Sequence, residues 1–208
     1  MVEDAELYRA WRAGDRAAGQ ALVERHYDSI VRFFRTKAGP QADDLVQRVF
    51  LVCADPQAGF RGESSFRTYL FGVARNLLLA HYRGRVRDAR VDADFSVQSV
   101  HDLGRGLSSV AAHRADERLL YDALQRIPLD IQMTLELFYW EDLTITELAA
   151  VLEIPEGTVK SRLHRGRVLL EQAMHTMPAA DDAKLSVRVK LAQWAAHMQA
   201  AAHGDDHG

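Results

Sequence analysis

Residues 143–170 read LTITELAAVLEIPEGTVKSRLHRGRVLL, and this stretch decides the fold. Apolar residues at Ile145, Leu148 and Leu152 recur with the spacing of one helix face. A second periodic run follows, and Pro155 and Gly157 stand between the two. The pattern therefore predicts two short helices joined by a tight turn.

The ends of these two helices carry residues that cap or break helices. Thr144 or Thr146 can cap the first helix, and Glu147 stands three residues after Thr144, as a capping box requires. Pro155 cannot continue a helix and favours extended backbone at the residue before it. Thr158 is then the candidate cap of the second helix. We therefore expect a short turn around Pro155.

The second predicted helix separates into an apolar face and a cationic face. Four apolar side chains are expected to pack on neighbouring helices: Val159, Leu163, Val168 and Leu170. Six polar side chains are expected mostly on the outward side: Lys160, Ser161, Arg162, His164, Arg165 and Arg167. Such a face fits the DNA major groove, where Arg and Lys reach guanine edges or phosphates. The alternative is a solvated charged helix in an ordinary bundle, but the cap, turn and basic face together favour a helix-turn-helix.

Composition places the chain among globular proteins. Of its 208 residues, 48% are hydrophobic and 26% are charged, which is enough apolar material for real cores. The single cysteine, Cys53, excludes an internal disulfide framework and lies in an apolar run, where a buried thiol is expected. The N-terminus lacks a hydrophobic signal core, and no apolar run approaches the ~20 residues of a membrane span. We therefore expect a cytoplasmic protein without membrane insertion.

Charge is distributed unevenly along the chain. The net charge of −3 is unexpected for a DNA-binding protein. Residues 61–90, however, carry a net +5, whereas residues 113–153 carry a net −6. The first region is suited to phosphates, while the second would repel them and is suited to a basic protein surface.

Helical periodicity recurs throughout the chain. Ahead of residues 143–170, helices are expected over 3–13, 16–34, 41–54, 66–83, 115–125 and 130–140. Pro, Gly and Ser mark a loop at 55–65, and residues 91–110 lose periodicity, as a linker does. After Pro178, residues such as Leu185 and Val189 indicate one more helix face. The fold class is therefore all-α, with two helical domains joined by a flexible linker and followed by a C-terminal helix.

Asp43 and Asp44 lie in the first turn of the helix expected at 41–54. They either serve only the helix dipole or form a polar docking face with Gln47 and Arg48. Paired carboxylates also suit metal or acid chemistry, but no further ligand is near in sequence. No nucleophile–base arrangement or Gly-rich phosphate loop accompanies them, so no catalytic residue, metal site or cofactor is predicted.

The helix expected at 66–83 interleaves aromatic residues with arginine. Arg67, Tyr69, Arg75 and Asn76 offer polar groups and a ring. Single-stranded bases stack on such rings while guanidinium groups hold the backbone. The alternative is that the aromatic residues here belong to the core.

Three motifs carry a resemblance to a known family: ADDLVQRVF, FRGESSFRTYLFGVARN and IPLDIQMTLELFYWEDLTITELAAVLEIPEGTVKSRLHRGR. In this order they resemble the extracytoplasmic-function sigma factors of bacteria, over about residues 5–175. The resemblance implies an alternative sigma factor, not an enzyme, that recruits RNA polymerase core to promoters and needs no cofactor. The implied division is a region 2 domain at 1–87, a linker at 88–112 threading toward the polymerase active-site cleft, a region 4 helix-turn-helix domain at 113–175, and an extension at 176–208.

The resemblance also implies roles for single residues. Contact with polymerase core is implied for Asp43, Asp44, Leu45, Gln47, Arg48 and Phe50. Recognition and melting of the minus-ten element are implied for Arg61, Gly62, Glu63, Ser64, Ser65, Arg67, Tyr69, Arg75 and Asn76. Recognition of the minus-35 duplex by the helix-turn-helix, about residues 145–164, is implied for Thr158, Lys160, Ser161, Arg162, His164 and Arg165. The implied partners are the polymerase beta-prime clamp and beta flap, promoter DNA, and an anti-sigma factor or an autoinhibitory C-terminal extension.

The chain departs from the family pattern at three positions. Arg48 stands where an acid is usual, Tyr69 replaces the common Trp, and Gly166 replaces Ala, which weakens a helix by about 1 kcal/mol. Three rival classes remain open from the sequence. They are a stand-alone helix-turn-helix regulator, an enzyme and a structural helical adaptor.

Overall fold

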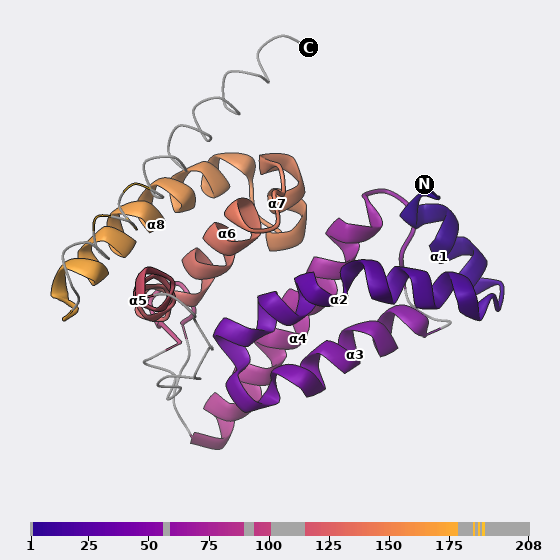
Figure 1. The fold of residues 1–208 in the computed structure, drawn as a ribbon, viewed down its shortest axis with the longest axis horizontal. Coiled ribbons are helices and arrows are strands. Elements are labelled where there is room, and N and C mark those ends of the chain that lie inside the picture. The colour runs from indigo at the N-terminus through magenta and orange to yellow at the C-terminus, as the bar shows by residue number, and fades with distance from the viewer. Residues whose placement is uncertain are drawn as a thin grey trace, which may run out of the picture.

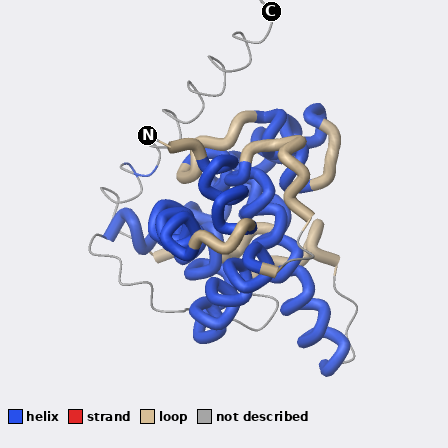
Figure 2. The backbone as a smooth tube through the Cα atoms, turned by 90° about the vertical axis from the view of Figure 1, so that its right-hand side faces the viewer, coloured by secondary structure: helices blue, strands red, loops and turns tan. Residues whose placement is uncertain are grey.

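A computed structural model of the chain describes residues 2–55, 59–89, 94–100 and 115–178, together with residues 185, 187 and 189. Within those residues the regular structure is helical, as the absence of red segments in Figure 2 shows, and the β pairing is confined to an isolated bridge between Ser99 and Pro128. The all-α prediction is therefore confirmed. The helices are α1 (Asp4–Arg12), α2 (Arg16–Ala38), the short 3-10 helix η1 (Gly39–Gln41), α3 (Ala42–Ala54), α4 (Phe66–Ala89), α5 (Ala115–Leu124), α6 (Leu129–Tyr139), α7 (Ile145–Leu152) and α8 (Glu156–Thr176).

Helices α1–α4 form the N-terminal domain, drawn from indigo to magenta in Figure 1. Helix α2 packs against α1, α3 and α4. Asp15 begins α2 by accepting hydrogen bonds from the backbone amides of Ala17 and Ala18, at 2.9 and 3.2 Å. Phe34 and Phe71 are fully buried in the core between these helices. Both aromatic residues are core residues, although Phe71 lies in the segment for which base stacking was considered.

Helices α5–α8 form the C-terminal domain (Figure 1). The capping box at its helix-turn-helix is confirmed, because Thr144 accepts from the Glu147 amide and the Glu147 side chain accepts from the Thr144 amide. Glu153 then takes left-handed backbone at φ 56°, which ends α7 and reverses the chain. The predicted cap at Thr158 is wrong. Helix α8 already begins at Glu156 after Pro155, and the Thr158 amide donates to the Pro155 carbonyl inside the first turn.

The two faces of α8 largely follow the prediction. Val159, Leu163 and Leu170 are buried. Val168 was expected to pack, but its side chain is 45% exposed, whereas Arg167 is partly buried. The boundary between the faces is therefore rotated in the C-terminal half of the helix.

Gly166 lies in the tightly packed contact between α8 and α6. A Cβ atom added to Gly166 would lie 2.8 Å from Cγ2 of Ile131 and 3.0 Å from Cδ1 of Leu135. Both neighbours are buried and have no space to retreat. The departure from Ala at this position is thus explained by close helix packing.

Residues 94–100 of the expected linker pack against both domains. The Leu129 amide donates to the Gln98 carbonyl at 3.0 Å, and Val100 is buried. The Phe95 ring lies 6.1 Å from the Tyr82 ring of α4, centroid to centroid. Helix α4 also continues six residues past its predicted end at 83, to Ala89. The chain between the two domains therefore contributes packing of its own in this part.

Residues 185, 187 and 189 of the C-terminal extension are helical, in agreement with the helix expected after Pro178. Val187 is fully buried, whereas Leu185 and Val189 are 62% and 49% exposed. Of the predicted apolar face, Val187 is therefore the residue that packs, while Leu185 and Val189 remain largely exposed. The rest of the predicted helix lies outside the described residues.

We expect Gly166→Ala to lower the free energy of unfolding by about 1–3 kcal/mol through overpacking against α6, outweighing the ~1 kcal/mol gained in helix propensity. Gly157→Ala in the same helix is the matched control, because nothing lies within 4 Å of its added Cβ. Urea unfolding of both variants gives the comparison. Equal or greater stability of Gly166→Ala would contradict the close packing.

Cys53 is fully buried, and this burial raises the pKa of its thiol to about 12. Because the thiolate is the reactive form, we expect a disulfide reagent at pH 8 to label the native chain at least about 100-fold more slowly than the urea-unfolded chain. Absorbance of the released thiol measures the rate. Fast stoichiometric labelling of the native chain would be incompatible with this packing.

Candidate nucleic-acid interface

The outward face of α8 presents four of the six residues predicted to contact duplex DNA. Lys160, Ser161, His164 and Arg165 are exposed along one side of the helix. The Ser161 hydroxyl donates to the Thr158 carbonyl at 2.9 Å, and Thr158 itself is partly buried. Helix α7 packs behind α8, so this face is held on a rigid support.

Arg162 lies on a different side of α8. Its guanidinium is 2.8 Å from a carboxylate oxygen of Asp130 on α6. Burial raises the pKa of Asp130, although Arg162 opposes that shift. Arg162 also lines a cleft of about 360 Å³ whose other wall carries Arg75 and Arg83 of α4. Its side chain is therefore not on the face that carries Lys160 and Arg165.

The loop at residues 61–65 is exposed throughout. Gly62 adopts φ 76°, a conformation that favours glycine. Ser65 begins α4, since its hydroxyl oxygen accepts from the Thr68 amide at 3.0 Å. Arg61, Glu63 and Ser64 are thus open to a ligand, whereas Ser65 also serves as the helix cap.

Tyr69 is partly buried in an aromatic cluster. Its ring lies 5.3 Å from that of Phe60 and 6.2 Å from that of Phe66. Burial raises the pKa of its hydroxyl to about 12. Further along α4, Asn76 is exposed, and its side-chain oxygen accepts a hydrogen bond from the Arg75 guanidinium at 3.2 Å. Of these two predicted minus-ten residues, Asn76 is therefore accessible to DNA, whereas Tyr69 is only partly accessible.

Helix α3 presents an exposed polar face. Asp43, Asp44, Gln47 and Arg48 all lie at the surface, as a docking face requires. Leu45 was predicted to contact a partner, but its side chain is 1% exposed and holds α3 on the core instead. Phe50 is partly buried, and its ring stacks on that of Tyr27 with centroids 6.4 Å apart.

The same helix carries apolar surface that sequence reasoning missed. Leu51 is 60% exposed, Val52 is 38% exposed, and Tyr27 of α2 is 47% exposed nearby. In the sequence, Leu51 lies off the apolar stripe that is buried in its helix, and this position was the signal that could have identified it as exposed apolar surface. Exposed apolar side chains beside a polar face are typical of a protein–protein contact.

The two domains meet through a buried ion pair. Lys37 of α2 is fully buried and its ammonium donates to Glu136 of α6, which is 3% exposed. The Thr36 hydroxyl donates to the same carboxylate at 3.0 Å, and the Gln132 amide donates to it at 2.7 Å. Burial lowers the pKa of Lys37, and the charge of Glu136 opposes the shift. This pair lies about a hundred residues apart in sequence and was not predicted.

Further ion pairs surround the buried one. Glu141, which is 4% exposed, lies 2.9 Å from the Arg32 guanidinium and 3.2 Å from that of Arg67. Arg67 also donates to the Glu141 carbonyl. Arg75 lies 3.1 Å from Glu153 at the end of α7. In each pair the cation comes from the N-terminal domain and the anion from the C-terminal domain. The acidic region of the sequence thus meets a basic protein surface, and that surface belongs to the same chain.

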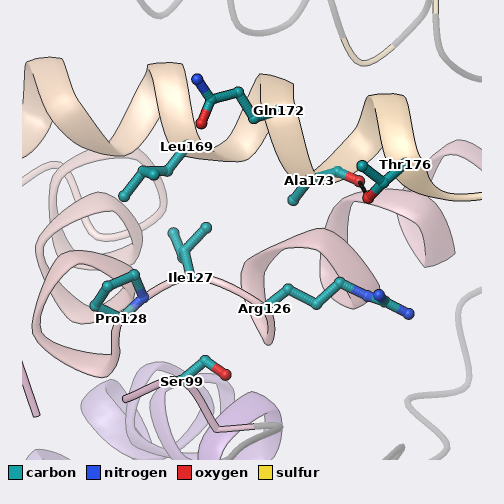
Figure 3. A pocket seen from close by; sticks show the side chains of 8 residues that line it. All are labelled: Ser99, Arg126, Ile127, Pro128, Leu169, Gln172, Ala173 and Thr176. Carbon is teal, nitrogen blue, oxygen red and sulfur yellow. Dashed lines mark hydrogen bonds between the residues drawn. The ribbon is translucent and has the colours of Figure 1, made fainter. Parts of the chain in front are cut away.

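A second cleft, of about 400 Å³, opens on the other side of the C-terminal domain. Figure 3 shows Leu169 and Gln172 of α8 above Ile127 and Pro128, with Ser99 below them. Its lining is mixed, and it contains none of the predicted DNA-binding or core-binding residues. Among the described residues, no cluster of metal-ligating side chains occurs, and no helix is long and apolar enough to cross a membrane.

Comparison with protein families matches both domains. Residues 22–88 match the family model for sigma-70 region 2, and residues 117–170 match the model for sigma-70 region 4. The RNA polymerase sigma-H factor of Pseudomonas aeruginosa is 30% identical over 187 residues, covering 84% of this chain and 95% of that protein. The sigma-E factor of Haemophilus influenzae, an extracytoplasmic-function sigma factor, is 27% identical over 188 residues, covering 85% and 98%.

Two solved structures share the fold. One contains the sigma factor RpoE of Bartonella quintana with the anti-sigma factor NepR, at TM-score 0.61 and 22% identity, covering 76% of this chain and 98% of that one. The other contains CnrH with the cytosolic domain of CnrY, at TM-score 0.61 and 22% identity, covering 84% and 99%. The two family models, the relatives and the helical fold agree. The chain belongs to the extracytoplasmic-function sigma factors, a class of DNA-binding regulators of transcription initiation rather than enzymes.

Proposed function

We propose that this sigma factor binds RNA polymerase core through α3, reads the minus-35 duplex with α8, and captures melted minus-ten DNA with the loop at 61–65 and the face of α4. The observation that carries the proposal is the exposed row of Lys160, Ser161, His164 and Arg165 on a capped helix-turn-helix. A helix of this kind offers donors to base edges and phosphates in the major groove.

The proposed core contact is the surface of α3 that the C-terminal domain leaves open. Asp44, Gln47 and Arg48 supply its polar part, and Leu51 supplies its apolar part. By family resemblance the partner surface is the beta-prime clamp, while the beta flap receives the C-terminal domain. Leu51 is our addition to the residues that the resemblance implies.

The proposed minus-ten contact combines an open loop with a helix face. Arg61, Glu63 and Ser64 project from a loop that Gly62 turns sharply, which suits the capture of an extruded base. Arg67, Tyr69, Arg75 and Asn76 would hold the adjoining strand. Capture of an unstacked base offsets part of the cost of opening the duplex.

The proposed domain division is 1–87, a linker at 88–112, 113–175 and an extension at 176–208. The buried side chain of Val187 supports a docked extension. A regulatory role for the extension, or inhibition by an anti-sigma partner, is the control we expect for this chain. Such a partner accompanies RpoE in its solved structure. Because RNA polymerase would be its target, the cytoplasm is the expected compartment.

Run-off transcription with purified polymerase core on a promoter library separates this function from its rivals. We expect the chain to start transcription at a subset of promoters, because it would supply both DNA-reading surfaces. A stand-alone regulator or a helical adaptor would neither co-purify with core nor initiate. Failure to direct core to any start site, with residues 177–208 present or removed, would refute the proposal.

We expect Arg165→Ala to reduce run-off transcription about tenfold and to relax selectivity at its base position, since one specific contact is worth about 1–3 kcal/mol. Arg126→Ala is the control, because Arg126 is an exposed arginine of the same domain that lies outside the outward face of α8. Transcription from templates substituted in the upstream element measures both effects. Equal losses for the two variants would argue against reading by α8.

We expect Leu51→Glu to weaken capture of polymerase core about tenfold or more, because a charge would replace an apolar contact at the centre of the proposed surface. Val2→Glu introduces the same charge at a residue that is 53% exposed in the same domain, and it serves as the control. A fluorescence titration of labelled chain with core gives both affinities. Unchanged affinity for Leu51→Glu would remove Leu51 from the interface.

A further inference from the structure

The arginines proposed to hold promoter DNA are occupied inside the chain. Arg67 contacts the buried carboxylate of Glu141, and Arg75 contacts the carboxylate of Glu153, which is exposed at the end of α7. The Arg75 side chain is only 16% exposed. Arg32 completes the set by sharing Glu141 with Arg67. While the two domains remain in contact, the carboxylates of Glu141 and Glu153 therefore compete with a DNA phosphate for these cations.

Carboxylates fill the same chemical role here that phosphates fill in DNA. A guanidinium binds either anion through paired, charge-assisted hydrogen bonds. Glu141 receives two guanidinium groups at 2.9 and 3.2 Å, and the three acids of the interdomain ion pairs all lie within residues 136–153. This acidic segment would itself repel DNA if it were exposed beside the arginines.

The buried centre of the interface favours one arrangement of the domains. Lys37 and Glu136 are both excluded from water, and Thr36 and Gln132 complete the hydrogen bonds of the carboxylate. Removing one partner would leave a buried charge unpaired, which the chain can relieve by opening or by neutralising the remaining group. Closure of the two domains is therefore coupled to the alignment of α2 on α6 that brings Lys37 to Glu136.

The surface of α3 remains accessible in this arrangement. Asp44, Gln47 and Leu51 are exposed, and none of the interdomain ion pairs includes them. A partner can therefore engage α3 before the domains separate. Binding there would then be compatible with the closed form, whereas binding of DNA to α4 would not.

We propose that the free chain is self-inhibited: Glu141 and Glu153 occupy the DNA-binding arginines of α4 as internal substitutes for promoter phosphates, and the Lys37–Glu136 pair holds them there. The proposal rests on the proposed function, because it takes Arg67 and Arg75 as DNA contacts. Apparent DNA affinity is reduced by the fraction of open molecules. Opening in the polymerase complex would restore it.

The test compares Glu141→Gln/Glu153→Gln with Glu6→Gln/Glu24→Gln in the full chain. Both variants lose two negative charges, but Glu6 and Glu24 are exposed residues of the N-terminal domain. The probe is a fluorescent 30-nucleotide single-stranded DNA, titrated without polymerase, and small-angle X-ray scattering reports the dimensions of the free chain. We expect the interface variant to bind DNA on the order of tenfold more tightly than the control variant and to be more extended. Equal affinities would overturn the proposal.

A charge reversal tests the buried pair separately. Glu136→Lys should open the chain and tighten DNA binding, and Lys37→Glu/Glu136→Lys should return both readouts toward the values of the unaltered chain. Glu6→Lys controls for the added charge, and circular dichroism shows whether each variant folds. If Glu136→Lys does not fold, the interface variant alone decides.

Run-off transcription at saturating core separates the two proposals. If the unaltered chain and the interface variant both initiate, the proposed function stands, and the DNA titration alone decides self-inhibition. If neither initiates, the proposed function fails, while the titration and scattering still show whether the acids shield the arginines.

Discussion

The buried pair of Lys37 and Glu136 is the constraint on which the arrangement of the whole chain depends. An ammonium group with no exposed surface requires an anion and hydrogen-bonding partners, because desolvation otherwise favours its neutral form. The anion comes from the other domain, and Thr36 and Gln132 complete its shell. Such a pair adds little stability over apolar packing, but it permits few alternative registers. The domains are consequently held by a specific contact.

Charge segregation along the sequence explains how one chain serves both a closed form and a DNA-binding role. Cations gather in residues 61–90 and anions in residues 113–153, so the two segments are complementary. Arg67 and Arg75 find Glu141 and Glu153 when no nucleic acid is present. The outward face of α8 takes no part in these pairs. The net charge of −3 hides this division, because the opposing segments nearly cancel.

Local structure was predictable from the sequence because short-range chemistry determines it. The Thr144 capping box and the break at Pro155 follow from neighbouring residues, and the structure confirms them. The cap predicted at Thr158 was a local error, because α8 already begins at Glu156. The other errors arose where tertiary packing decides. Val168 is exposed although Leu170 and Met174 beyond it are buried, and Gly166 is required by Ile131 of a different helix. The pairing of Lys37 with Glu136 joins residues far apart in sequence, and the uneven charge indicated only that an acidic segment should meet a basic surface.

The separation of the two domains in solution tests this account most directly. With one spin label on the exposed face of α3 and another on that of α8, double electron–electron resonance spectroscopy measures the distance between the two labels. The measurement is made on the free chain and on its complex with polymerase core. The account predicts one short, narrow distance distribution for the free chain and a clearly longer distance in the complex. A broad distribution in the free chain, or the same distance in both states, would contradict it.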